Sequence, residues 1–169
     1  MNFQELIKRR YACRKYTDKL VEESKIEQIL EAGRFAPTAA NTQSVSVMVI
    51  KEANKIKEIV NVYEAPVVFV ICADRNLVWK REFDKREFCD VDSSIVATHM
   101  MLMATELGLD SIWISYFDPK KLCELLKIPD NFEVTSILGV GYGEEVDNEI
   151  RTHLVSRKSI NQFRIDANL

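Results

Sequence analysis

The sequence predicts a single layered domain of the α+β or α/β class, in which helices cover a central sheet. Its 169 residues are the usual length of one domain and can bury a core without a metal or a disulfide. Four short, strongly apolar runs have the length of buried strands, and segments with apolar residues three or four positions apart predict helices. The predicted strands are 46–50, 66–72, 111–115 and 134–140.

Capping residues mark the ends of several predicted helices. Asn2 and Glu5 have the spacing of a capping box, which begins a first helix. Gly108 stands where a left-handed cap would end the longest helix. Asp118 and Pro119 are in the order of an N-cap and a first-turn proline. Three of the predicted helices are 2–10, 22–33 and 90–107. A short fourth helix would have Ile56, Ile59, Val60 and Tyr63 on one face. The last would begin at 119 and point Leu122, Leu125 and Leu126 inward.

Charge and hydropathy exclude several classes of function. The 23 basic and 26 acidic side chains give a net charge of −3, which does not predict the basic face that nucleic acids require. No apolar run approaches the roughly 20 residues of a membrane span, and the first residues do not resemble a secretory signal. We therefore expect a cytoplasmic protein that binds neither nucleic acid nor membrane.

The cysteines do not predict a metal site or a disulfide framework. They are far apart in the sequence and form no C-x-x-C pair, which a zinc site would normally contain. Free and mostly buried thiols are the expected state of Cys13, Cys72, Cys89 and Cys123.

Two segments do not show a clear secondary-structure pattern. Residues 75–88 mix charged and aromatic side chains, and the pattern assigns them to neither a helix nor a strand. Residues 147–169 are polar with isolated apolar side chains, too few to form a core of their own. We expect 1–169 to form one domain, with 147–169 as a C-terminal arm that packs on a second subunit.

The first candidate site is the basic run 9–15, where four cations lie within seven residues. Such a density of charge favours a nearby anion. Arg10 and Arg14 are arginines, and a guanidinium can donate two parallel hydrogen bonds to a phosphate. The alternative is a solvated basic helix end, where the cations complement the helix dipole.

The second candidate is the loop 36–43, between a helix and a buried strand. Asn41 and Gln43 each carry a donor and an acceptor that could bind the edge of a heteroaromatic ring. Ala39 and Ala40 are small enough to let a flat ligand approach the backbone. An ordinary turn with an Asx cap is the alternative.

The third candidate is 108–117, where a buried strand ends in aromatic and hydroxyl side chains. The ends of strands are common ligand-binding positions in open sheets. For Trp113 the alternative is aromatic packing in the core. No Ser-His-Asp order, Walker loop or G-x-G-x-x-G is present, so the sequence gives no support for a hydrolase or an ATPase.

Taken together and in this order, these segments resemble the FMN-dependent nitroreductase family. Residues 10–16 (RYACRKY) are similar to its R-x-S-x-R-x-[FY] element, and 36–43 (APTAANTQ) to its A-P-S-x-x-N-x-Q loop. Residues 92–114 are similar to the family's helix that ends in A-x-x-x-G-[LV]-x-x-x-W-I, here ATELGLDSIWI. Residues 139–142 (GVGY), followed by 156–158 (SRK), resemble the closing strand and a late basic residue. The resemblance covers nearly the whole chain.

The resemblance implies an α+β fold of three layers, with a central, mostly antiparallel sheet flanked by helices. It also implies a homodimer that holds two FMN molecules at the subunit interface, and a ping-pong NAD(P)H oxidoreductase that reduces nitroaromatics, quinones or similar acceptors. Because the flavin performs the redox chemistry, no catalytic side chain is expected. A dehydrogenase or dehalogenase of the same fold, or a non-enzymatic FMN-binding redox sensor, are the alternative functions.

The family's cofactor contacts carry over onto specific positions of this chain. The phosphate would be held by Arg10, Arg14 and Arg157, with Tyr11 and Ala12 beside it. Asn41 and Gln43 would hydrogen-bond the pyrimidine side of the ring, and the ring would be lined from the other subunit by Pro37, Thr38 and Ala39. Backbone groups of Ile114 and Ser115 would lie at flavin N5, flanked by Trp113.

Four residues depart from the family pattern. Ala12 stands where the family usually has a serine, so backbone N–H groups must replace its hydroxyl. Ser44 and Val45 replace the usual Pro-Trp, and Ser115 replaces a frequent glycine or glutamate. The short segment 75–92 leaves little room for a lid, so we expect a more open pocket.

Overall fold

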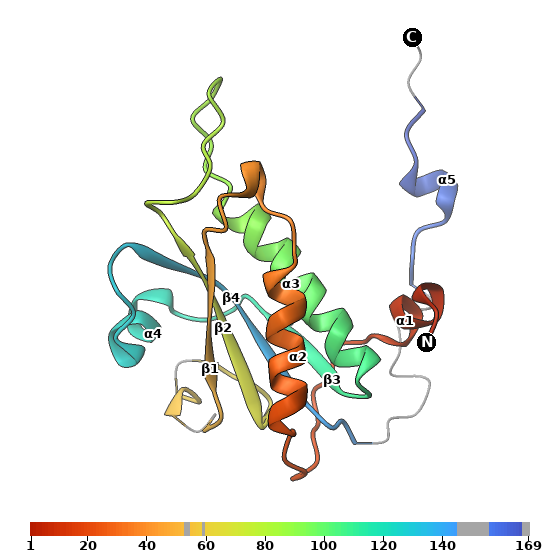
Figure 1. Cartoon of the computed structure of the whole chain (residues 1–169). Coiled ribbons are helices and arrows are strands. Elements are labelled where there is room, and N and C mark those ends of the chain that lie inside the picture. Colours follow the sequence, from red (N-terminus) through yellow and green to blue (C-terminus); the bar gives the residue numbers. More distant parts are fainter. Residues whose placement is uncertain (53–54, 59, 145–155, 167–169) are drawn as a thin grey trace.

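A four-stranded antiparallel sheet forms the centre of the fold, with helices on both faces (Figure 1). The computed structural model describes residues 1–52, 55–58, 60–144 and 156–166. In chain order the elements are α1 (Phe3–Arg9), α2 (Glu23–Arg34), the 3₁₀ turn η1 (Ala39–Asn41), β1 (Val45–Ile50), β2 (Val67–Asp74), α3 (Cys89–Glu106), β3 (Asp110–Ile114), α4 (Pro119–Leu126), β4 (Phe132–Gly141) and α5 (Ile160–Phe163).

The strands lie in the order β1-β2-β4-β3, and each neighbouring pair is antiparallel. The α+β expectation is therefore confirmed, and the parallel α/β alternative is wrong. Residues of β2 alternate between the faces: Phe69 and Ile71 pack toward α2 and α3, whereas Val68 and Val70 pack on the other side. Both faces are covered, which explains why this strand is apolar without interruption.

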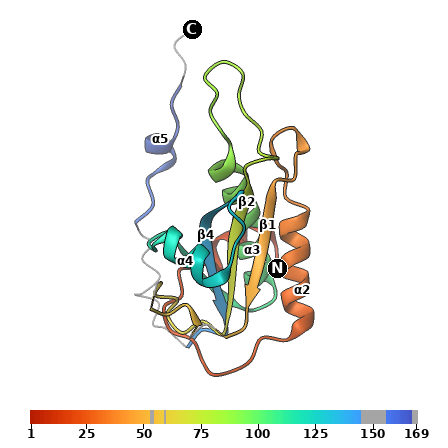
Figure 2. The ribbon, with the colours of Figure 1, turned by 90° about the vertical axis from the view of Figure 1, so that its left-hand side faces the viewer.

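The helices form the two outer layers (Figure 2). On one face α2 and α3 pack on the sheet and on each other. Gly33 allows their close contact, because a Cβ at this position would lie only 2.8 Å from Cγ of Met100. On the other face α4 contributes Leu122, whose side chain is fully buried.

The caps formed as the sequence predicted. The Glu5 N–H donates to Oδ1 of Asn2 (3.0 Å), and the Asn2 N–H donates to Oε2 of Glu5 (3.3 Å). Gly108 has a φ of 76°, and a Schellman motif ends α3 through hydrogen bonds from Gly108 N–H to Thr105 O (3.1 Å) and from Leu109 N–H to Ala104 O (2.9 Å).

Asp118 caps α4, where its Oδ1 accepts a hydrogen bond from the Lys121 N–H (3.1 Å). Because α4 is anchored in the core by Leu122, Asp118→Ala is expected to lower the free energy of unfolding by about 1 kcal/mol. Urea denaturation monitored by circular dichroism measures this value. Asp118→Asn keeps the acceptor and serves as the control; equal destabilisation by both variants would contradict the capping role.

One prediction about a buried side chain and one about a helix were wrong. Leu125 is 48% exposed, because α4 contacts the sheet along a narrow stripe that includes Leu122 and Leu126. Tyr63 was expected on the face of a short helix, but its φ of 55° lies outside the helical region. Ile56 and Val60 of that segment are buried, while Ile59 lies outside the described residues.

The segment 75–88 contains an antiparallel hairpin that extends beyond the end of the sheet (Figure 1). Lys80 and Glu87 form a bridge, and the rings of Trp79 and Phe88 meet edge to face with centroids 4.8 Å apart. Phe83, within the hairpin loop, is 97% exposed.

The described part of the C-terminal arm, 156–166, lies to the side of the sheet (Figure 1). Each of these residues is exposed. The arm includes three apolar side chains that contribute nothing to the core of their own chain: Ile160, Phe163 and Ile165. The remainder of the predicted 147–169 arm lies outside the described residues, so its packing on a second subunit stays a prediction.

Candidate functional site

Arginines from the two ends of the chain lie near enough for their charges to interact. Arg10 is the C-cap of α1 and is half-buried, and Arg157 belongs to the C-terminal arm. Burial and the positive charge of Arg157 lower the pKa of Arg10. No ion pair between described residues involves either guanidinium. Two cations whose charges interact, and which have no carboxylate partner in the described part of the chain, make a site that favours an anion.

The segment after Arg10 runs along the outer edge of β3. Ala12 forms a parallel bridge with Ser111, and the Cys13 N–H donates to Ser111 O (2.9 Å). Tyr11 is buried and Ala12 is half-buried. Ile114 lies three residues further along β3, or about 10 Å. Arg10 and the backbone groups of Ile114 and Ser115 therefore lie along one edge of the sheet.

Trp113 does not point freely into solvent. Its half-buried side chain packs against the hydrophobic cluster between the sheet and α2–α3. The two neighbouring side chains of β3, Ile112 and Ile114, pack on the opposite face. Ser115 follows the strand and is exposed.

Arg14 lies in a second, polar part of this region. It lines a cavity of 440 Å³ together with Lys15, Tyr16, Asn61, Tyr63, Glu64 and Glu144. The Arg14 guanidinium lies 5.8 Å from the centroid of the Tyr63 ring, within range of a cation–π interaction. Sequence reasoning missed both Asn61 and Tyr63 as neighbours of Arg14.

The turn 61–64 that carries these neighbours is held by an Asx-type hydrogen bond. The Tyr63 N–H donates to Oδ1 of Asn61 (2.9 Å), and Tyr63 and Glu64 have φ values of 55° and 58°. Asparagine favours turns because its side chain can accept a hydrogen bond from the backbone N–H two residues later. That signal could have separated this turn from the helix predicted over it.

The loop 36–43 adopts a strained conformation. Ala40, Asn41 and Gln43 have φ values of 50°, 54° and 51°, a left-handed conformation that costs alanine or glutamine about 1–2 kcal/mol and that asparagine adopts more readily. The Gln43 N–H donates to Oγ1 of Thr38 (3.0 Å). Pro37, Asn41 and Gln43 are exposed, and the side chains of Asn41 and Gln43 make no hydrogen bond to any described residue. Strain of this kind clusters at ligand-binding sites.

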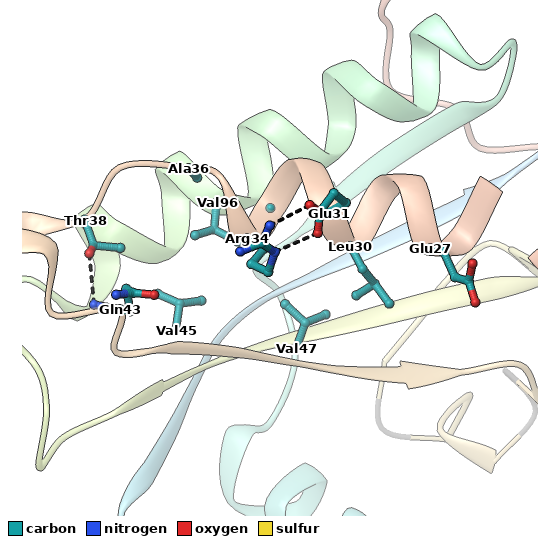
Figure 3. A pocket seen from close by; sticks show the side chains of 11 residues that line it. Glu27, Leu30, Glu31, Arg34, Ala36, Thr38, Gln43, Val45, Val47 and Val96 are labelled. Carbon is teal, nitrogen blue, oxygen red and sulfur yellow. Dashed lines mark hydrogen bonds and ion pairs between the residues drawn. The ribbon is translucent and has the colours of Figure 1, made fainter. Parts of the chain in front are cut away.

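Beside this loop, a groove of 440 Å³ separates α2 from β1 (Figure 3). Thr38 and Gln43 line one end, and apolar side chains including Leu30, Val45 and Val47 line its length. Arg34 in this groove donates two hydrogen bonds of 2.6 Å to the carboxylate of Glu31. Arg34 is therefore paired with a carboxylate, whereas Arg10 forms no ion pair with a described residue.

The two candidate half-sites lie at opposite ends of α3. The Ala39 N–H donates to Oδ1 of Asp92 in the first turn of α3, whereas the amino group of Met1, just before α1, pairs with Glu106 in the last turn of α3 (3.2 Å). Asp92 and Glu106 lie 14 positions apart along the helix, which is about 21 Å. One chain therefore does not bring the loop 36–43 to the arginines.

The described residues contain neither a candidate metal site nor a candidate membrane span. No group of three or more His, Cys, Asp or Glu side chains there could hold a metal ion, and none of the helices described combines the length and hydropathy of a membrane span. The cysteines are free, and burial raises the pKa of Cys72 to about 12.

The sequence and the fold match known proteins. The family model described as the nitroreductase family matches residues 7–64 and 60–142. A nitroreductase family protein from Clostridium difficile 630 superposes with a TM-score of 0.94 at 41% identity, covering 100% of both chains. An FMN-dependent nitroreductase from C. difficile R20291 gives a TM-score of 0.74 at 26% identity over 97% of this chain and 98% of that one.

Two curated relatives have names that describe redox enzymes. A protein of Archaeoglobus fulgidus, named in the NADH dehydrogenase/NAD(P)H nitroreductase class, is 30% identical over 151 residues, which cover 83% of this chain and 84% of the relative. An FMN reductase [NAD(P)H] of Bacillus subtilis is 26% identical over 89% of this chain and 68% of its own length.

Proposed function

This chain belongs to the nitroreductase family, and from that premise we propose that it is an FMN-dependent NAD(P)H oxidoreductase. Its acceptors would be nitroaromatics, quinones or similar compounds, reduced in a ping-pong reaction. The observation that carries the proposal is the juxtaposition of Arg10 and Arg157 without a carboxylate partner among the described residues. The names of the relatives support the class of oxidoreductase.

The residues present fit an FMN phosphate. Two guanidiniums repel each other unless an anion lies between them, and a phosphate can accept parallel hydrogen bonds from each. Ala12 offers no hydroxyl, so Arg10, Arg14 and Arg157 would bind the phosphate with help from backbone N–H groups. When bound, FMN supplies the hydride and electron chemistry, which the protein orients.

The ring would lie between the edge of β3 and the loop 36–43. Asn41 and Gln43 have exposed amides that would hydrogen-bond the pyrimidine side, while Pro37, Thr38 and Ala39 would line the ring. We place backbone groups of Ile114 and Ser115 at the reactive edge, flanked by Trp113. No side chain is needed as a nucleophile or as a general acid.

A second copy of the chain would bring these halves together. On α3, Val91, Ile95 and Leu102 are only half-buried and lie on one face with Thr98, at the spacing of a helix–helix contact. A twofold axis across this face would pack two α3 helices antiparallel. The loop end of one copy would then lie beside the arginine end of the other, so that each FMN contacts both chains.

The C-terminal arm is proposed to add to the same interface. Ile160, Phe163 and Ile165 are 72%, 79% and 94% exposed, and such a group of apolar side chains marks a contact with another protein. We assign this contact to the partner subunit, which would also fix Arg157 beside Arg10.

Purification without added cofactor tests the proposal. We expect yellow protein with the absorption bands of flavin, bleached by NADH or NADPH and restored by a quinone, with parallel lines in double-reciprocal plots. A colourless protein that FMN cannot reconstitute would refute FMN binding. A yellow protein that NAD(P)H cannot bleach would instead favour the redox sensor. A yellow protein that oxidises another substrate would favour the dehydrogenase.

A further inference from the structure

The carboxylate of Asp92 ties the start of α3 to the strained loop 36–43. Its Oδ1 accepts a hydrogen bond of 2.9 Å from the Ala39 N–H, across 53 positions of sequence. Asp92 is only 1% exposed, although it is a charged residue. Its Oδ2 is buried as well and has no hydrogen-bond partner among the described residues. A carboxylate is rarely buried in this way without a function that requires it.

The hydrogen bond from Ala39 to Asp92 lies directly before the residues of the loop with positive φ. Ala39 begins the turn, and Ala40 and Asn41, which follow it, both have positive φ values. At the far end of the turn, the Gln43 N–H bonds to Thr38 within the same loop. Asp92 therefore links the turn to the rigid body of the domain, and its place in the first turn of α3 lets the helix dipole stabilise its charge.

We propose that Asp92 is a positioning residue for the ring half of the flavin site, an inference that rests on the proposed function. The hydrogen bond from Ala39 to Asp92 holds Ala40 and Asn41 in the left-handed conformation. In that conformation the exposed amides of Asn41 and Gln43 face outward, available to the ring. Without the carboxylate, the Ala39 N–H loses its buried acceptor, and the backbone relaxes toward negative φ.

Riboflavin and FMN together distinguish the ring half from the phosphate half, since riboflavin has the ring but no phosphate. We expect Asp92→Leu to weaken binding of both ligands by the same factor, about tenfold, which corresponds to one lost hydrogen bond to a charged group. Asp92→Asn retains an acceptor oxygen for Ala39 and is expected to stay within about threefold of the wild type. Fluorescence titration of cofactor-free protein measures both affinities.

Ser93 provides a matched control on the same helix turn. It is also 1% exposed, and its hydroxyl makes no hydrogen bond to the loop. Ser93→Ala is expected to bind both flavins like the wild type. Wild-type affinities in Asp92→Leu would overturn the inference, as would a loss confined to FMN or an equal loss in Asp92→Asn.

Amide hydrogen exchange tests the loop without a variant. In the cofactor-free wild type, the Ala39 amide is expected to exchange at least about tenfold more slowly than its intrinsic rate, because the acceptor is buried. Exchange at the intrinsic rate would overturn the inference even if Asp92→Leu failed to fold. If the wild type binds neither FMN nor riboflavin, the proposed function fails. If the wild type binds both flavins and Asp92→Leu binds them equally well, only the positioning role of Asp92 is refuted.

Discussion

Replacing Arg10 with alanine is expected to weaken FMN binding by about 10- to 100-fold and to leave riboflavin affinity unchanged. Each hydrogen bond from a guanidinium to a charged acceptor contributes about 1.5–3 kcal/mol. The half-buried Arg10 side chain is screened less by solvent than an exposed one. Titration of cofactor-free protein with each flavin, followed by quenching of flavin fluorescence, measures the effect.

Arg9 supplies the matched control, because it carries the same charge one position earlier in the last turn of α1 and is exposed. Arg9→Ala is expected to change FMN affinity by less than about threefold at physiological salt. Arg157→Ala is expected to reproduce the loss seen for Arg10→Ala. If Arg9→Ala and Arg10→Ala weakened FMN binding equally, a general electrostatic attraction would explain the data better than a defined phosphate site.

Phe69→Ala is expected to lower the free energy of unfolding by about 3–5 kcal/mol. Phe69 is fully buried at the centre of β2, where it is paired with Val49 on one side and Leu138 on the other. Its ring lies in the cluster between the sheet and the α2–α3 layer, so truncation leaves a cavity that rigid neighbours cannot fill. Urea denaturation at constant temperature measures the loss.

Leu77 is the control for this substitution, since it is apolar but 54% exposed. Leu77→Ala is expected to change the free energy of unfolding by less than about 0.5 kcal/mol. A loss below about 1 kcal/mol for Phe69→Ala would mean that the core is packed loosely at its centre. Where Phe69→Ala remains folded, it should bind FMN with wild-type affinity, because Phe69 lies in none of the proposed contacts.

The secondary structure could be predicted because its signals are local. Asn2, Gly108 and Asp118 act on backbone groups within a few residues, and each formed the cap that its position indicated. The apolar runs identified all four strands, with ends within two residues of those observed. The antiparallel pairing was predicted from the family resemblance, since strand periodicity alone does not specify which strands are neighbours.

The features that sequence reasoning missed depend on long-range contacts. The apolar pattern around Tyr63 fits a helix, but the turn set by Asn61 and the packing of Arg14 decide its conformation. The bond from Ala39 to Asp92 joins segments that no local pattern connects. The hairpin of 75–88 depends on cross-strand pairs such as Lys80 with Glu87, which a search for alternating apolar residues does not detect.

A mixture of two defective variants tests the shared site most directly. One chain would carry Arg10→Ala and Arg157→Ala, and the other would carry Asn41→Ala and Gln43→Ala; each homodimer should bind FMN poorly. After the subunits are exchanged by mild denaturation and refolding, a heterodimer of shared sites has one intact site, so about a quarter of all sites are expected to bind FMN like the wild type. No recovery of tight binding, with heterodimers verified by mass spectrometry, would contradict a flavin held between two chains.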